Sequence, residues 1–211
     1  MRMSMLLCFA LLGMVLAGPI SATDIQQQVS RLPPLPQPLD PILQTMFDSR
    51  AAAGGAVINL TLVRGHAPKF AKAAEASAYA IRFDATTPRN LRELVIYRTA
   101  QIVGSEYEIN QHTPLMKMCG YSGEQIAQVA TWQNSKLFDD KQLALLAYVE
   151  QMAHGGVVDD PVFANLAKFF TSQEIVEITF TVGNYYGTGL FAKALKIDIE
   201  SDGRLTVAGK C

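Results

Sequence analysis

The chain has 211 residues, of which 49% are hydrophobic and 18% charged, and its formal net charge is −1. These values are typical of one compact globular domain, or at most two, and they exclude a mainly disordered chain. Lysine and arginine are scattered rather than gathered into a basic stripe, so we expect no nucleic-acid partner.

The first 22 residues have the pattern of a secretory signal peptide. Arg2 supplies a basic start, residues 6–17 are apolar, and Ala22 ends a stretch of small residues suited to cleavage. A retained membrane anchor is the rival interpretation, but the apolar run is well short of the roughly 20 residues that cross hydrocarbon. We therefore expect cleavage near Ala22 and a secreted or periplasmic protein with no stable membrane insertion afterwards.

Residues 23–41 form the next segment and contain five prolines. Because successive prolines fix φ and exclude helix, we expect an extended arm that serves as a linker or lies as a strap on a neighbouring element.

From residue 42 to about 200, apolar residues recur at helical spacing. Several helix starts are recognisable, namely Thr87 before Pro88, Asp160 before Pro161, and capping boxes at Ser122–Gln125 and Thr171–Glu174. The stretch 175–195 could suggest a membrane span, but charged residues interrupt it and its three glycines favour close packing against another helix. We expect an all-α domain of about seven to nine helices with antiparallel neighbours.

The tail, residues 201–211, follows the last helix. Residues 197–207 predict a small hairpin around Ser201-Asp202-Gly203. The last residue, Cys211, can form a disulfide with Cys119 in an oxidising compartment, but Cys119 lies in an apolar helical pattern. The sequence therefore favours a buried, inert thiol at Cys119 over the disulfide.

Polar side chains gather where one helix ends and the next begins. Ser105, Glu108 and His112 are spaced i, i+3 and i+7, so they share a face of the second helix. Glu93 lies in the preceding helix, which must fold back after Gly104. If the two faces meet, the imidazole lies between two carboxylates.

The alternative interpretation is a capped helix start. Ser105-x-x-Glu108 is itself a capping box, and acidic residues near a helix N-terminus complement its dipole. His112 would then be a satisfied, half-buried histidine. Spacing alone leaves both interpretations open.

The stretch 89–126 resembles the central motif of the carboxymuconolactone decarboxylase and alkylhydroperoxidase D superfamily, in which a Glu is followed by Cys-x-x-Cys-x-x-x-His. The family Glu falls on Glu93 and the family His on His112, while the two cysteine positions fall on Ser105 and Glu108. Flanking segments match as well, so the likeness extends over about residues 57–200.

The resemblance implies that residues 42–200 form an alkylhydroperoxidase D-like helical domain. Family members of this kind are trimers or hexamers, so it also implies a homo-oligomer. In the peroxidase branch the cysteines form a sulfenate and a disulfide, which a serine hydroxyl and a carboxylate cannot form. The chain is therefore similar to the decarboxylase branch, which implies a cofactor-free acid–base lyase or isomerase acting on a small lactone or aromatic-derived acid.

In this hypothesis the imidazole of His112 transfers the proton, with Glu93 and Glu108 as its partners. The substrate-binding candidates are Tyr97, Tyr107 and Ser105, with one of the two tyrosine hydroxyls as oxyanion donor. Nearby carboxylates raise the pKa of a histidine and burial lowers it, and we expect the carboxylates to prevail.

The alternative function is a non-enzymatic protein that binds a small molecule on the same scaffold. The chain has three histidines without metal-ligand spacing, so we expect no metal site, and the resemblance to the decarboxylase branch implies that no organic cofactor is needed. Arg89 and Arg92 flank the face of Glu93 rather than sharing it, which leaves paired carboxylates that repel a doubly charged acid. We therefore expect a small-molecule substrate that is neutral or singly charged.

Overall fold

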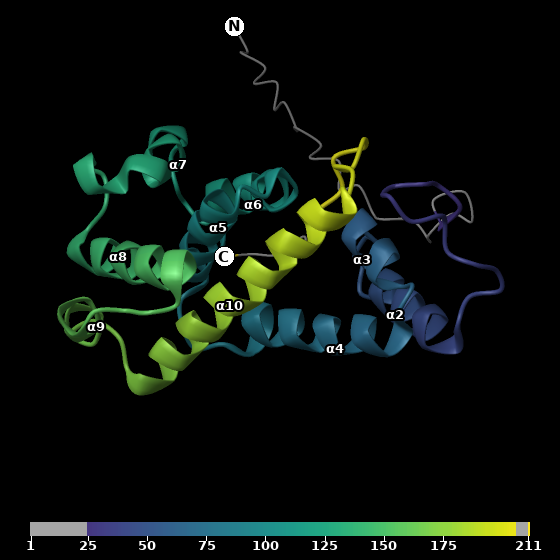
Figure 1. Cartoon of the computed structure of the whole chain (residues 1–211), viewed down its shortest axis with the longest axis horizontal. Helices are drawn as coiled ribbons and strands as arrows, with labels where there is room; N and C mark the ends of the chain where they lie inside the picture. Colours follow the sequence, from purple (N-terminus) through teal and green to yellow (C-terminus); the bar gives the residue numbers. More distant parts are fainter. Residues whose placement is uncertain (1–24, 206–210) are drawn as a thin grey trace, which may run out of the picture.

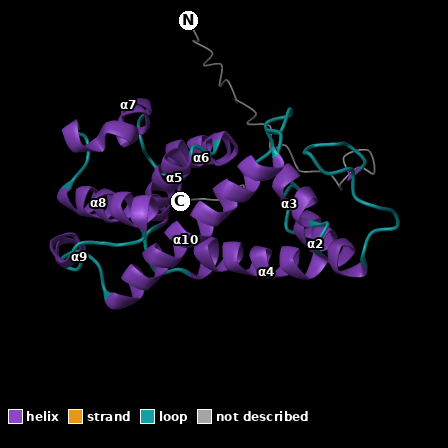
Figure 2. Ribbon diagram, viewed as in Figure 1, coloured by secondary structure: helices purple, strands orange, loops and turns teal. Residues whose placement is uncertain are grey.

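The computed structural model describes residues 25–205 and Cys211, and every regular element among them is helical (Figures 1 and 2). The α-helices are α2 (Pro41–Ala52), α3 (Asn59–Arg64), α4 (Pro68–Tyr79), α5 (Arg89–Val103), α6 (Glu106–Met118), α7 (Gly123–Gln128), α8 (Asp140–Gly155), α9 (Asp160–Leu166) and α10 (Ser172–Leu195). A π-helical turn, η1 (Ala80–Asp84), continues α4, and a 3-10 turn, η2 (Val129–Asn134), continues α7. The all-α prediction is confirmed, while the predicted signal peptide lies outside the described residues.

Helix α5 lies at the centre of the domain and packs against α6, α8 and α10. Eleven of its 15 residues are buried, so the helix has no solvent-facing side over most of its length. Polar residues on α5 must therefore find partners inside the protein. Figure 1 shows the long helix α10 crossing the molecule beside this centre.

Helix α6 folds back from α5 through a one-residue turn. Gly104 has φ 68°, a left-handed conformation that glycine adopts without steric cost, and it ends α5. Ser105 follows at once as the N-cap of α6. The turn brings a face of α6 onto the buried face of α5 that carries Glu93.

Helix ends follow the predicted chemistry in part. Both predicted capping boxes are present, at Ser122–Gln125 and Thr171–Glu174. The prediction at the start of α5 was wrong, because Pro88 precedes the helix instead of opening it and the Thr87 hydroxyl donates to Glu177 Oε2 at 2.7 Å. Asp160 is likewise the first residue of α9 and not its cap.

The proline-rich arm lies against its own chain. Its residues Val29 and Leu35 are buried, and the Val29 carbonyl accepts a hydrogen bond from the Asp198 amide at 2.9 Å. Residues 197–205 contain no strand, so the predicted hairpin is absent from this described part of the tail. The segment is held instead by the backbone bond to Val29 and by hydrogen bonds to the Glu200 side chain.

A disulfide joins Cys119 to Cys211, with a Cα–Cα distance of 5.0 Å. The expectation of an inert buried thiol was therefore wrong. Cys119 is the C-cap residue of α6 and is only partly buried, so its sulfur lies at the helix end where the last residue of the chain can reach it.

Helix α10 approaches the α5–α6 turn closely at one glycine. A Cβ atom built on Gly189 would lie 3.0 Å from Val103 Cγ1 and 3.2 Å from Ser105 Cβ, whereas Gly183 and Gly187 face open space. The prediction that glycines allow close helix packing therefore holds for Gly189 alone. Within residues 25–205, no helix combines the length and apolar character that a membrane span requires.

Candidate active site

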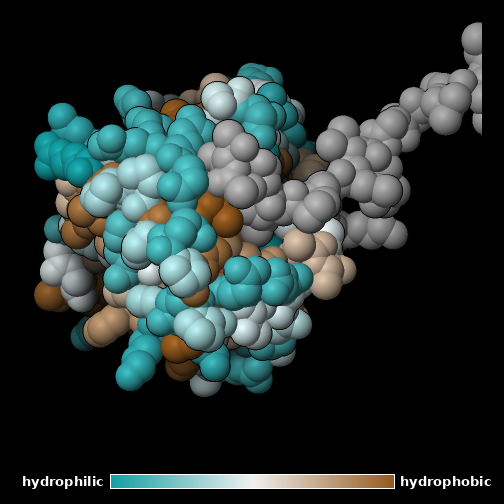
Figure 3. Space-filling model, turned by 90° about the vertical axis from the view of Figure 1, so that its right-hand side faces the viewer, coloured by the Kyte–Doolittle hydropathy of each residue, from teal (hydrophilic) through white to brown (hydrophobic). Residues whose placement is uncertain are grey.

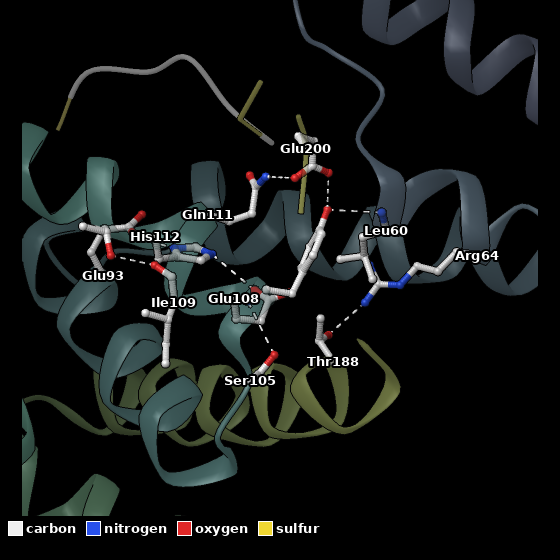
Figure 4. A network of polar contacts seen from close by, with 12 residues as sticks. Leu60, Arg64, Glu93, Ser105, Glu108, Ile109, Gln111, His112, Thr188 and Glu200 are labelled. Carbon is white, nitrogen blue, oxygen red and sulfur yellow. Dashed lines mark hydrogen bonds and ion pairs between the residues drawn. The ribbon is translucent and has the colours of Figure 1, made fainter. Parts of the chain in front are cut away.

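The carboxylates of Glu93 and Glu108 converge on the imidazole ring of His112 (Figure 4). Glu93 Oε2 lies 2.7 Å from His112 Nδ1, and Glu108 Oε2 lies 3.5 Å from His112 Nε2. Glu93, Glu108 and His112 are 1%, 3% and 1% exposed, respectively. Helix α5 supplies the first carboxylate, and α6 supplies the ring and the second carboxylate one turn apart.

The capping interpretation of Glu108 is met only in part. Ser105 Oγ accepts a hydrogen bond from the Glu108 amide at 3.5 Å, so Ser105 caps α6 as predicted. The return bond of a capping box is missing, because the Ser105 amide donates to the Ala100 carbonyl at 2.9 Å. The carboxylate of Glu108 is therefore left to face His112.

The surroundings of His112 favour its charged form. Burial lowers the pKa of the ring, but the charge of Glu93 and hydrogen bonds to Glu108 and Glu93 outweigh burial and raise the pKa to about 9. Burial raises the pKa of Glu93, yet the opposing effects of His112 and Arg89 leave it below its usual value. The site at neutral pH thus holds an imidazolium between two carboxylates.

Arg89 contributes to this charge balance, contrary to the sequence-based placement of the arginines. Its Nε donates to Glu93 Oε1 at 3.0 Å, one helical turn away. Glu93 therefore has a cation on each oxygen, His112 on one and Arg89 on the other. The expected repulsion from two uncompensated carboxylates does not arise.

A small cavity lies against the ring. Its volume is about 30 Å³, which gives room for one or two water molecules, and His112 and Glu108 form part of its wall. Glu108 Oε1 is buried and has no hydrogen-bond partner among the described residues. A carboxylate oxygen beside a cavity is consequently available to a ligand.

The remainder of the cavity wall is rich in cations. Arg50, Arg64 and Arg82 line it together with Glu75, so three guanidinium groups and the imidazolium face two carboxylates. Arg64 Nη2 donates to Thr188 Oγ1 at 2.8 Å, and among the described residues no carboxylate lies within ion-pair distance of it. Burial lowers the pKa of Arg64, and the charge of Glu108 opposes this. The wall can accept an anion.

The predicted tyrosines have other roles. Tyr97 lies in the hydrophobic core with Leu94 and Met116 and does not reach the cavity wall. The ring of Tyr107 lines the cavity, but its hydroxyl donates to Glu200 Oε1 at 2.5 Å and accepts from the Leu60 amide at 3.2 Å. Burial and then the charge of Glu200 raise the pKa of Tyr107. Neither hydroxyl is placed as a free oxyanion donor.

Sequence reasoning missed Glu200, whose hydrogen bonds hold the segment after α10 in place. Glu200 is 5% exposed and also accepts bonds from the Asn59 amide at 2.8 Å and Gln111 Nε2 at 2.6 Å (Figure 4). The carboxylate thereby joins the start of α3, helix α6 and the segment after α10. These contacts hold Tyr107 and Gln111, which both line the cavity.

Tyr185 is the second residue that sequence reasoning missed. Its ring lies edge-on to His112, with 5.2 Å between centroids, and it lines the cavity. Burial raises the pKa of its hydroxyl, so Tyr185 keeps its proton. A signal existed in the sequence, since Thr181, Tyr185 and Thr188 form a polar stripe at i, i+4 and i+7 on an otherwise apolar helix.

Within the described residues, no group of three or more histidine, cysteine, aspartate or glutamate side chains is arranged to hold a metal ion. The donor groups of the site are oxygen and nitrogen atoms that bond to one another and to arginines.

Residues 68–151 match the family model of the carboxymuconolactone decarboxylase family, and this stretch holds Glu93, Ser105, Glu108 and His112. The chain is 28% identical over 111 residues to the YnjA protein of Escherichia coli strain K12. That match covers 52% of this chain and 61% of YnjA, less than two thirds of the relative.

Two solved structures illustrate the shared fold. An alkylhydroperoxidase AhpD core, a peroxidase-related protein from Ralstonia eutropha JMP134, has a TM-score of 0.71 at 19% identity and covers 86% of this chain and 100% of its own. The debrominase Bmp8 has a TM-score of 0.66 at 19% identity and covers 83% and 93%; a cysteine-to-alanine variant of it has been solved with 2,3,4-tribromopyrrole. Residues 68–151 are therefore similar to the carboxymuconolactone decarboxylase family, and the two solved structures show that the chain shares the alkylhydroperoxidase D-like fold.

Proposed function

We propose that this protein is a cofactor-free acid–base catalyst, a lyase or isomerase, that acts on a small lactone or aromatic-derived acid carrying one negative charge. The observation that carries the proposal is the pairing of His112 and Glu108 at the cavity wall. His112 holds a proton, Glu93 fixes its Nδ1 side, and Glu108 presents an unbonded oxygen beside it. A charged donor and a free acceptor thus lie side by side.

In an isomerisation, Glu108 Oε1 takes a proton from a carbon next to a carbonyl group, and the electron pair of the broken C–H bond forms a dienolate. His112 then gives the Nε2 proton to another carbon of the dienolate. Rotation of the protonated Glu108 carboxyl group then turns its O–H toward His112 Nε2, at the place where Oε2 lies 3.5 Å from that nitrogen, and the proton returns to the ring so that both charges are restored.

In a decarboxylation, the C–C bond to the carboxylate breaks, CO₂ leaves, and the bond's electron pair forms the same dienolate. The imidazolium again protonates the carbon, and solvent supplies the next proton to the ring. We assign the hydrogen bond to the enolate oxygen to Tyr185, which lines the cavity beside His112, and the cationic wall favours a substrate with one carboxylate.

Thiol peroxidase chemistry is not part of the proposal. Ser105 and Glu108 stand at the positions where the peroxidase branch has cysteines, and Cys119 is bound in a disulfide at the far end of α6. The disulfide is in keeping with our proposal of an exported protein, since oxidising compartments preserve such bonds. By resemblance to the superfamily we also propose a homo-oligomer.

The test is a screen of small lactones and phenolic or alicyclic monocarboxylic acids by thermal shift, followed by turnover assays on the compounds that bind. We expect Glu108→Gln and His112→Gln to lower kcat by about 10²-fold or more, the usual contribution of a positioned acid or base. Glu106→Gln is the matched control, because Glu106 lies in the same first turn of α6 but is exposed. Full activity in Glu108→Gln would contradict the mechanism, and binding without turnover of any compound would favour the non-enzymatic alternative.

A further inference from the structure

The inner cavity is too small for the substrate class proposed above. Its volume of about 30 Å³ holds water but no ring compound. A second hollow of about 470 Å³ on the same measure lies between α2 and the rod formed by α4 and η1. Arg50, Glu75 and Arg82 belong to the walls of both hollows. These three side chains therefore form the partition between the large groove and the reactive groups.

Glu75 is the movable member of the partition. Its Oε1 accepts from Arg50 Nη2 at 2.6 Å and lies 3.7 Å from Arg82 Nη2. The side chains of Arg50 and Arg82 are 11% and 7% exposed, and Arg50 is also tied to the Ala56 carbonyl at 3.0 Å. The Glu75 side chain is 34% exposed, so it can swing into solvent while the two arginines stay in place.

The outer groove offers an aromatic wall. The rings of Tyr79 and Phe83 lie 4.8 Å apart, both about half exposed, and Met46 of α2 faces the same hollow. Such a wall suits a flat apolar ring. The side of the molecule where α2 and α3 lie is mostly hydrophilic, with hydrophobic side chains in separate patches (Figure 3). A small molecule fits this surface better than a protein partner, which needs a larger apolar patch.

We propose that this groove binds the apolar body of the substrate and that Glu75 is a displaceable partition through which the substrate's polar end reaches His112 and Glu108. The substrate is then an amphipathic acid, a flat ring with one terminal carboxylate. As that carboxylate enters, it replaces the Glu75 carboxylate between Arg50 and Arg82, so the two cations keep an anionic partner throughout. The inference rests on the proposed function for the role of His112 and Glu108.

The partition is tested without a substrate through the exchange of the His112 ring proton with water, measured by NMR saturation transfer. Glu75→Gln weakens the contact to both arginines, so we expect the exchange to become at least about tenfold faster, which corresponds to a gate weakened by 1.4 kcal/mol or more. Lys72→Gln is the matched control, because it removes one exposed charge from the same helix. Equal exchange rates in Glu75→Gln and the control would overturn the partition.

The groove is tested by isothermal titration with phenylacetate and acetate. We expect phenylacetate to bind at least about tenfold more tightly than acetate, and Phe83→Ala to remove this difference without changing acetate binding. Equal affinities, or no effect of Phe83→Ala, would overturn the groove assignment. Neither measurement needs turnover. If Glu75→Gln speeds the exchange but the wild-type protein turns over no compound, only the proposed function is contradicted. If the wild-type protein is active but Glu75→Gln leaves the exchange unchanged, only the partition is contradicted.

Discussion

At the residue scale, the charge of His112 depends on the carboxylates on both sides of its ring. A buried imidazolium with one carboxylate would be costly, but here each ring nitrogen faces an acidic oxygen and Arg89 compensates one of the acids. The cluster is close to neutral as a whole. The protein can therefore stay folded around this cluster while His112 holds a proton for transfer.

The charge of His112 should make folding stability depend on pH. The pKa of the ring rises from 6.5 to about 9 on folding, so the folded protein holds this proton more tightly and the stabilisation is complete below pH 6.5. It is lost as pH rises through about 9, which lowers the free energy of unfolding by roughly 3 kcal/mol. Urea unfolding between these pH values checks this, with His112→Gln expected to give a flatter profile.

The control for the pH profile is His154→Gln, because the His154 side chain is 60% exposed and should leave the wild-type slope unchanged. A wild-type stability that stays level across this window would show that His112 is neutral in the folded protein, and the acid–base proposal would lose its proton donor.

The roles of Tyr185 and Tyr97 can be distinguished by removing one hydroxyl group at a time. Tyr185→Phe should lower kcat by roughly 10²-fold if its hydroxyl stabilises an enolate oxygen, with little change in melting temperature, because the ring that packs edge-on against His112 is kept. Tyr97→Phe should leave kcat unchanged, since Tyr97 lies in the core. The reverse pattern in steady-state assays would return the role to Tyr97.

Residue spacing together with the family resemblance predicted that Glu93, Glu108 and His112 converge, whereas spacing misplaced Tyr97. Glu93, Glu108 and His112 could be predicted because Gly104 marks a turn between two helices, and helices joined by so short a turn have few ways to bring their polar faces together. Tyr97 shares a helical face with Glu93 only approximately, since a step of four residues also rotates by about 40° around the axis. That rotation carries Tyr97 into the core.

At the element scale, the site depends on how closely α10 approaches the α5–α6 turn. Gly189→Ala should destabilise the protein by roughly 1 kcal/mol, because the new methyl group would press on the branched side chain of Val103 at 3.0 Å. Gly187→Ala should instead stabilise it by about 0.5–1 kcal/mol, since that position is exposed and alanine favours helix. Thermal unfolding of both variants gives the comparison, and effects of equal sign would refute the packing argument.

Helix ends were predictable where the cap lies within one element, as at Ser122 and Thr171, and not where another element competes. The start of α5 differs from expectation because Glu177 on α10 binds the Thr87 hydroxyl. Arg64 on α3 and Arg82 on η1 reach the cavity only through tertiary packing. Because Arg64 and Arg82 are distant in sequence from Glu93 and His112, no local sequence pattern could predict that they line the same cavity.

At the scale of the whole molecule, both ends of the described chain close onto the helical domain. The arm pairs with the segment after α10, and Glu200 in that segment holds α3 and α6 together. The disulfide then ties the last residue to the end of α6. Spacing alone could not decide this pairing, because the two cysteines are 92 residues apart and no helix pattern connects them.

The disulfide should account for a large share of the stability of the folded chain. A cross-link spanning 92 residues restricts the unfolded state, and its loss should cost roughly 4 kcal/mol, or a fall of about 10 °C in melting temperature. The Cys119→Ser and Cys211→Ser variants should melt alike, and dithiothreitol should lower the wild-type value to theirs while leaving both variants unchanged. Scanning calorimetry with and without reductant tests this, and a wild-type melting temperature indifferent to complete reduction would mean that the contacts of Glu200 hold the tail without help from the cross-link.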